Sequence, residues 1–256
     1  MNRLSPTEEL LKDLGVTAAG DIDIEAIAYH VGAIIKYRPL DGCEGRIVGA
    51  GDRAVITVNS HAIPTRRRFS AAHELGHWHH HRGRSLVCWS DEIGNPAKGA
   101  LDPERVADGY AADLLMPDYL FAPMADQIGK ITFQAVEDLR QEFNTSITAT
   151  AIRLVEYGPE PAMLVCHTAN GRRWFCRPRH IPDKWFPQDQ LDADSYAMDV
   201  LHGKEERSRR VLIGADAWFD RWDAQKYELY EETCRTMDGE ILTLLVFKDE
   251  EMLQEL

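Results

Sequence analysis

The sequence predicts an α+β protein built from three parts, and three patterns support this prediction. Short strand-like runs between residues 33 and 59 lead into a helical stretch that begins near Pro64. Apolar residues then recur at helical spacing over residues 131–157. Beyond the linker-like residues 158–161 (GPEP), strand patterns dominate the chain. We therefore expect three domains, at residues 1–128, 129–158 and 159–256.

The first domain is expected to open with two helices and a small antiparallel sheet. Ser5 is a predicted N-cap with Glu8 three residues on, and Gly15 ends that helix. A second helix, opened by Asp23, is expected over residues 24–31. Alternating apolar and polar residues then predict three strands, at residues 33–37, 45–49 and 54–59.

The helical stretch that follows contains the sequence His73-Glu74-Leu75-Gly76-His77. Residues four apart lie one turn above each other on a helix, so His73 and His77 can point their imidazoles at one metal ion. Zinc suits this pair because neutral imidazole is a good ligand for a borderline-soft ion. Glu74 lies about 100° round the helix, where its carboxylate can take a proton from an attacking water. Gly76 weakens a helix interior, which indicates a close approach by another backbone, such as a strand or a substrate.

Two histidines do not complete such a site, because a catalytic zinc usually has three protein ligands and a water. His81 lies eight residues beyond His73, about 12 Å along the helix axis, so the two cannot share one ion. His79, His80 and His81 are therefore interpreted as solvated residues of the helix end. The third ligand must come from another element.

Another helix, which contains acidic residues, is predicted over residues 102–117. Asp102 is a good N-cap and Pro117 ends the helix. Glu104 and Asp108 share one face because they are four residues apart. Acidic residues in a first turn can simply favour the helix dipole. Because the histidine pair lacks a ligand, Glu104 is the best donor and Asp108 the best acceptor for a ligand imidazole N–H.

The two motifs together resemble those of the ImmA/IrrE family of zinc metallopeptidases. HELGH at residues 73–77 is followed by E-x-x-A-D-x-Y-A-A-x-L-L-M-P at residues 104–117, and RRRFSAA at residues 66–72 matches the usual lead-in of the family. The resemblance covers residues 1–157. It implies a zincin-like peptidase domain of the gluzincin type.

By that match, His73, His77 and Glu104 hold zinc and Glu74 is the general base. The family often has Asn where this chain has Asp108, a departure that leaves the ligand set intact. The E-x-x-x-D spacing also resembles that of thermolysin-type gluzincins, in which the Asp supports a zinc-binding His.

The resemblance further implies a cytoplasmic endopeptidase that cleaves a helix-turn-helix repressor and so switches on genes of a mobile element or a stress response. In zinc peptidases a sheet edge commonly holds the substrate as an added strand. The strand at residues 54–59 is our candidate for that edge, and an ordinary core strand is the equal alternative.

The composition bounds the other classes of function. A net charge of −13, from 29 basic and 42 acidic residues, argues against a protein whose main task is to grip nucleic acid. Five scattered cysteines without a CxxC pair are interpreted as reduced thiols of a cytoplasmic protein. The chain has no apolar signal region and no apolar run of about 18 residues, so no membrane partner is expected.

Residues 131–157 are predicted to form two helices that break near residue 145. A helix-turn-helix DNA reader would have this layout. However, the cations Lys130, Arg140 and Arg153 are outnumbered by acidic residues here, which does not make a phosphate-binding surface. Packing against the peptidase domain, or docking of a repressor, is therefore favoured over direct DNA binding.

The last domain is predicted to be α+β. We expect a hairpin at residues 162–168 and 172–177, a helix at 188–203, and strands at 209–214, 226–235 and 240–248. Four of the six tryptophans lie here, namely Trp174, Trp185, Trp218 and Trp222. They are interpreted as core residues, with a small-molecule pocket as the alternative. The three-part layout resembles that of IrrE-type members, whose last domain is similar to a GAF sensor fold, so a small-molecule effector is a candidate partner.

A function of a different class stays open on the sequence alone. The chain could be a non-proteolytic regulator that binds DNA or a repressor and uses zinc structurally. A catalytic site needs Glu74, whereas a structural site tolerates its loss. The group that would stabilise the oxyanion is not identified; Tyr110, where the family often has Phe, and His80 are candidates.

Overall fold

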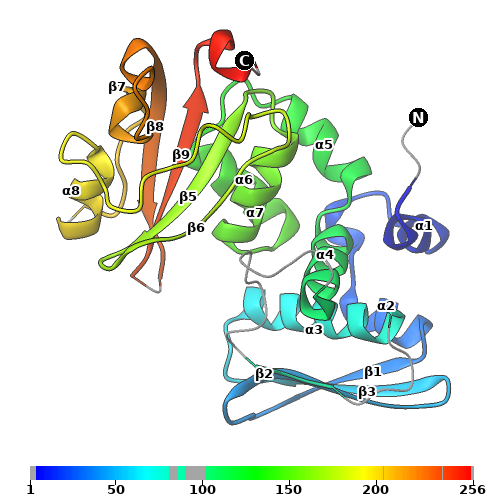
Figure 1. Cartoon of the computed structure of the whole chain (residues 1–256). Helices are drawn as coiled ribbons and strands as arrows, with labels where there is room; N and C mark the ends of the chain where they lie inside the picture. The colour runs from blue at the N-terminus through cyan, green and yellow to red at the C-terminus, as the bar shows by residue number, and fades with distance from the viewer. Residues whose placement is uncertain (1–3, 81–85, 90–101, 204, 238, 255–256) are drawn as a thin grey trace. The chain divides into compact units, whose positions relative to one another are not determined.

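The computed structural model describes residues 4–80, 86–89, 102–203, 205–237 and 239–254 (Figure 1). The chain is α+β and divides into two compact units. Unit 1 comprises residues 1–121 and 140–146, and unit 2 comprises residues 122–139 and 147–256. The division into three domains at residues 128 and 158 stays a prediction. Every helix of the described residues is too short or too polar to span a bilayer.

Unit 1 contains a four-stranded sheet with helices on one face (Figure 1). Its helices and strands are α1 (Pro6–Asp13), α2 (Ile24–His30), β1 (Ala33–Arg38), β2 (Cys43–Ala50), β3 (Arg53–Asn59), α3 (Pro64–His80), β4 (Leu86–Trp89) and α4 (Pro103–Leu115). Helix α3 packs on β2 and β3, and α4 packs on α3. Helix α5 (Asp118–Asp126) contains residues of both units.

Local capping accounts for where these helices begin. In α1, the Ser5 N–H donates to Glu8 Oε2 at 2.9 Å and the Glu8 N–H donates to Ser5 Oγ at 3.3 Å, which is the predicted capping box. Gly15 follows with a left-handed φ of 78°, as expected of a residue that ends a helix. Asp23 and Asp102 cap α2 and α4 through their side chains. These predicted helix starts are confirmed.

The sheet differs from the prediction in its order. The strands lie in the order β1-β3-β2-β4, and β2 pairs antiparallel with β3 and β4, whereas β1 pairs parallel with β3. The tight turn at Gly51, whose φ is 60°, folds β3 back on β2 and leaves the other side of β3 open to β1. The sheet is therefore mixed rather than wholly antiparallel.

Of the two alternatives for residues 54–59, the structure shows the core strand and not the edge. Residues 54–59 lie in β3, an interior strand whose two hydrogen-bonding sides are already paired with β1 and β2. They cannot be the edge that accepts an added strand. Residues 86–89 form β4 next to β2, a strand that was not predicted from the sequence; residues 90–101 lie outside the described part of the chain.

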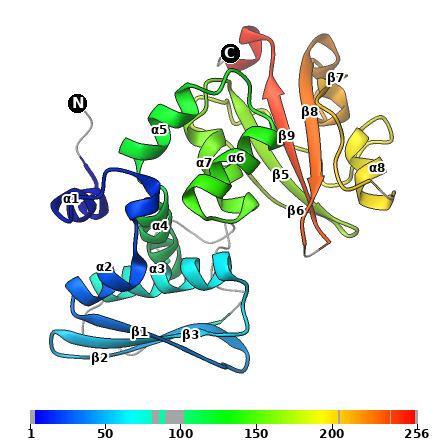
Figure 2. The same cartoon turned by 180° about the vertical axis from the view of Figure 1, so that it is seen from behind.

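Unit 2 is built on a five-stranded antiparallel sheet of order β6-β5-β9-β8-β7 (Figure 2). Its elements are α7 (Ile147–Tyr157), β5 (Ala162–Thr168), β6 (Gly171–Cys176), α8 (Tyr196–His202), β7 (Val211–Gly214), β8 (Glu228–Arg235) and β9 (Ile241–Phe247). Helix α7 packs on β5, and α8 packs on β8 and β9. The predicted hairpin and the three later strands are confirmed within a few residues; Asp238, between β8 and β9, lies outside the described residues.

Helix α6 (Phe133–Phe143) contains residues of both units, and α7 begins four residues after it ends. Asn144 lies between the two helices with a φ of 51°. Asparagine tolerates this left-handed conformation, which a helix interior does not permit. The predicted break near residue 145 is therefore confirmed.

Two details of unit 2 depart from the prediction. The helix expected at residues 188–203 is limited to α8, because Ser195 Oγ accepts the Ala197 N–H and starts the helix there. Trp185 and Trp218 are buried as expected, and Trp174 is half-buried. Trp222 is 75% exposed, so the expectation that it is a core residue was wrong.

Candidate metal centre

Helices α3 and α4 pack against each other with almost no space between them at Gly76. A Cβ atom added to Gly76 would lie 2.9 Å from Ala107 Cα and 3.1 Å from the Ala107 carbonyl oxygen. The close approach that Gly76 predicted is confirmed, and the approaching backbone is that of α4 rather than a strand or a substrate. Glu104 lies one helical turn before Ala107, so this packing brings its carboxylate to the histidines of α3.

Donor atoms from the two helices converge beside this packing. The Nε2 atoms of His73 and His77 lie 3.0 Å apart. Glu104 reaches His73 Nε2 at 3.1 Å through Oε2 and His77 Nε2 at 3.3 Å through Oε1. Both imidazoles are buried, and Glu104 is half-buried. Among the residues that the structure describes, these three form the one cluster of His, Cys, Asp or Glu with the spacing of a metal site.

The spacing of these atoms fits a tetrahedral ion. Zinc bonds imidazole nitrogen at about 2.0–2.1 Å, so two nitrogens on one tetrahedral ion lie about 3.3 Å apart. The separation of 3.0 Å between the two Nε2 atoms is close to this value. Two ring nitrogens that face each other at this distance need a proton or a cation between them, and the carboxylate of Glu104 adds negative charge. The donor set therefore suits a divalent metal.

Asp108 lies one turn after Glu104 and contacts the other side of the first histidine. His73 Nδ1 lies 2.9 Å from Asp108 Oδ1. A proton held on Nδ1 by this carboxylate leaves the Nε2 lone pair directed at His77 and Glu104. The structure thus places Asp108 where it can fix the tautomer of His73.

The electrostatics of the cluster favour added positive charge. Burial lowers the pKa of His73, but hydrogen bonds to Asp108 and Glu104 outweigh this effect and raise the pKa to about 9. Burial also opposes ionisation of Glu104, yet hydrogen bonds with His73 and His77 hold the pKa of its carboxyl well below the usual range. Surroundings that favour a proton on a ring nitrogen also favour a metal cation at the same place.

Glu74 is fully buried on α3, directly after His73. Its negative charge contributes to the raised pKa of His73, so its carboxylate lies within electrostatic reach of the cluster. On its other side the carboxylate lies against Gly45 of β2, where an added Cβ would be 2.5 Å from Glu74 Oε1. The structure therefore brings all four site residues predicted from the sequence, and Asp108, into one region.

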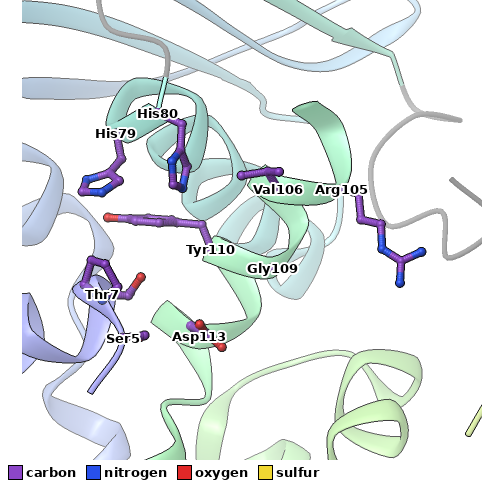
Figure 3. Close-up of a pocket in the computed structure, with 10 residues that line it drawn as sticks. Ser5, Thr7, His79, His80, Arg105, Val106, Gly109, Tyr110 and Asp113 are labelled. Carbon is purple, nitrogen blue, oxygen red and sulfur yellow. The ribbon is translucent and has the colours of Figure 1, made fainter. Parts of the chain in front are cut away.

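Tyr110 and His80 lie at a separate pocket of about 250 Å³ (Figure 3). The Tyr110 ring stacks on His79 at 5.2 Å between centroids and meets His80 edge-on at 6.0 Å. The residues that line this pocket, among those described, include none of His73, His77 and Glu104. The suggestion that Tyr110 or His80 stabilises an oxyanion gains no support from this placement. His79 and His80 are exposed, as predicted; His81 lies outside the described residues.

Comparison with known proteins places this geometry in a family. Residues 30–155, which include α3 and α4, match the family described as the IrrE N-terminal-like domain. Residues 30–155 form a domain of the ImmA/IrrE family. A domain of this metallopeptidase family implies a metal ion, and the cluster of His73, His77 and Glu104 is the candidate site for it.

One relative is consistent with this assignment, and one solved structure is consistent with the fold. The radiation response metalloprotease IrrE of Deinococcus radiodurans is 28% identical over 186 residues, which are 70% of this chain and 51% of that protein. The chain therefore spans about half the length of this relative. A solved structure described as a Mycobacterium tuberculosis transcriptional regulator matches with a TM-score of 0.61 and 14% identity, over 94% of this chain and 74% of that one. At that identity the likeness shows the fold alone.

Proposed function

We propose that the chain is a zinc-dependent endopeptidase of narrow specificity. The observation that carries the proposal is the convergence of His73 Nε2, His77 Nε2 and the Glu104 carboxylate beside the buried Glu74. In this proposal the three converging groups hold the zinc ion. Asp108 orients His73, and Glu74 is the general base.

The chemistry follows from these roles. When bound, zinc supplies a Lewis acid that polarises the scissile carbonyl and lowers the pKa of water towards about 7. Glu74 accepts the proton of the attacking water on a carboxylate oxygen and donates it to the leaving amine. Asp108 keeps a proton on His73 Nδ1 throughout. Because Glu74 is buried, bulk water does not compete for the proton that it carries.

The proposed substrate is a helix-turn-helix repressor of mobile-element or stress-response genes, cleaved in the cytoplasm. The relative that is 28% identical is a radiation response metalloprotease, which supports a role in a stress response. In this proposal residues 129–158 dock the repressor. Residues 159–256 form a GAF-like sensor domain that takes a small-molecule effector. The net charge of −13 speaks against direct DNA binding.

A Glu74→Gln variant tests the proposal. It should keep zinc and bind a candidate repressor encoded near the gene, but cleave it about 10²–10⁴-fold more slowly, the usual contribution of a general base. The matched control is Glu9→Gln on the exposed side of α1, which should cleave like the natural chain. Binding of the repressor without cleavage by the natural chain would instead favour a regulator with structural zinc. Equal degradation of casein and repressor would contradict narrow specificity.

A further inference from the structure

Gly45 lies inside β2, where the sequence gives no turn to explain a glycine. It is buried and pairs with Val58 of β3 and Cys88 of β4. Its φ is not among the left-handed values found in this chain, so a residue with a side chain could adopt the same backbone conformation. Glycine inside a strand has no side chain to pack against its neighbours, and it often marks a place where another group approaches the backbone closely. Space, rather than backbone freedom, is the reason for glycine here.

The space beside Gly45 is filled by Glu74. A Cβ atom at position 45 would lie 2.5 Å from Glu74 Oε1, 3.0 Å from Cγ and 3.2 Å from Cδ. All three distances are shorter than an ordinary carbon contact. Helix α3 packs on β2 and β3 through buried residues such as Leu75, so the helix is not free to retreat. A side chain at position 45 would therefore move the carboxylate rather than the helix.

We propose that Gly45 is a positioning residue that sets where the Glu74 carboxylate lies relative to the metal ligands. The inference rests on the proposed function, in which Glu74 is the general base. Moving Oε1 from 2.5 Å to ordinary contact with a new methyl group requires a displacement of about 1 Å, and a misplacement of this size can cost about 10²-fold in rate. The three atoms nearest to this methyl position all belong to Glu74, so we expect metal binding to change little.

Gly49 provides a matched control on the same strand. It lies four residues further along β2, on the same face, and also faces α3. A Cβ atom at Gly49 would lie 2.7 Å from Trp78 Cζ3. The Trp78 indole is buried and its Nε1–H donates to the Val31 carbonyl oxygen at 2.9 Å, so the ring cannot swing away. Gly49→Ala therefore crowds the interface of β2 and α3 without touching Glu74.

The first measurement separates kcat from KM, with the repressor as substrate, for Gly45→Ala and Gly49→Ala. Gly45→Ala should lower kcat by about 10²-fold while KM and zinc content stay near those of the natural chain. Gly49→Ala should lower the Tm more than Gly45→Ala does, with kcat nearly unchanged, because a rigid indole yields less readily than a carboxylate. Natural kcat in Gly45→Ala, or equal losses of kcat in both variants, would overturn the proposal.

The second measurement needs no catalysis and is made on chelator-treated protein. Gly45→Ala is combined with Glu74→Ala in a double-mutant cycle that is read out by Tm. The added methyl should lower the Tm when Glu74 is present and not when its carboxylate has been removed. Equal shifts in both backgrounds would refute the contact. If the natural chain cleaves no repressor, the proposed function fails, while this cycle still decides whether Gly45 positions Glu74.

Discussion

Units 1 and 2 both bury ionisable side chains, but they arrange them in opposite ways. In unit 1, His73, His77 and Glu104 direct donor atoms at one another, at 3.0–3.3 Å. In unit 2, the buried carboxylate of Glu231 is surrounded by neutral donors of its own unit. Donor atoms that face one another favour the binding of a cation between them. A buried carboxylate whose hydrogen-bond partners all lie in its own unit stabilises the fold instead.

Glu231 of β8 illustrates the second arrangement. Its carboxylate accepts hydrogen bonds from Ser195 Oγ at 3.1 Å, the Ala197 N–H at 2.8 Å and Trp218 Nε1–H at 2.8 Å. Burial nevertheless raises the pKa of this carboxyl above its usual value. The hydrogen bonds join the start of α8 to the sheet, and all of them are made within unit 2. The expected role of Glu231 is therefore structural.

The largest effect is expected when one of the three converging side chains of unit 1 is removed. Alanine at His73, His77 or Glu104 should weaken zinc binding by more than 10²-fold, because each removes a ligand. Asp108→Ala should cost about 10–100-fold, since it removes only the partner of His73 Nδ1. Competition with a chelator of known affinity measures each value. Arg105→Ala, at an exposed position on the same helix, is the control. Full zinc occupancy in Glu104→Ala would transfer the ligand role to Asp108 or Asp113.

The second prediction concerns removal of the buried carboxylate of unit 2. Glu231→Ala should lower the free energy of unfolding by about 3–5 kcal/mol, because Ser195 Oγ–H and Trp218 Nε1–H lose their acceptor and the Ala197 N–H keeps only Ser195 Oγ. Glu228→Ala on the same strand removes only an exposed ion pair with Lys248 and should cost less than about 1 kcal/mol. Urea denaturation followed by tryptophan fluorescence measures both. Similar costs for the two variants would show that Glu231 has no special structural role.

The third prediction concerns a buried histidine of unit 2 that contrasts with His73. His167 is 1% exposed, neither ring nitrogen makes a well-formed hydrogen bond within the described residues, and its ring meets Trp218 edge-on. Burial lowers its pKa to about 4, against a weak favourable contact with the Gln188 backbone. In the unfolded chain His167 therefore becomes protonated near pH 6.5, whereas in the folded unit it becomes protonated only near pH 4.

The stability contributed by neutral His167 is thus present above about pH 6.5 and is lost as the pH falls towards 4. The expected loss between pH 7 and pH 4 is about 3 kcal/mol. His167→Phe should remove this part of the pH dependence, whereas His180→Gln, at an exposed position of unit 2, should leave it unchanged. Denaturation curves at several pH values measure it. An unchanged acid loss in His167→Phe would assign the effect to other groups.

The smallest effect is expected for a substitution at Gly76, where α3 and α4 are in close contact. Gly76→Ala places a methyl group against the Ala107 backbone and should shift α4 enough to weaken zinc binding about 10-fold. Gly109→Ala on α4 meets no atom within 4 Å and should stabilise the chain by about 0.5–1 kcal/mol without changing zinc affinity. Chelator competition and thermal unfolding distinguish the two variants. Natural zinc affinity in Gly76→Ala would mean that α4 is held in place elsewhere.

Local sequence signals predicted the parts of the fold that depend on neighbouring residues. The capping box at Ser5 and Glu8 and the helical spacing of His73 and His77 are examples. Strand order could not be predicted, because alternation indicates that β3 is a strand but not that it lies between β1 and β2. Gly45 was missed as a site residue for the same reason: its meaning depends on which helix packs on β2. The ligand roles themselves stay a prediction.

The packing at Gly76 also has a consequence in terms of chain entropy. His77 and Glu104 are 27 positions apart, and an ion that had to gather them from a disordered chain would lose about 3–4 kcal/mol to loop closure. Contact between Gly76 and Ala107 closes this loop through the protein's own packing. The donor atoms are then already close together before an ion binds, and avoiding the loop-closure cost corresponds to a gain of several hundred-fold in metal affinity. A glycine, which has no side chain to bind a metal, is thus expected to raise the affinity of the candidate site for its ion.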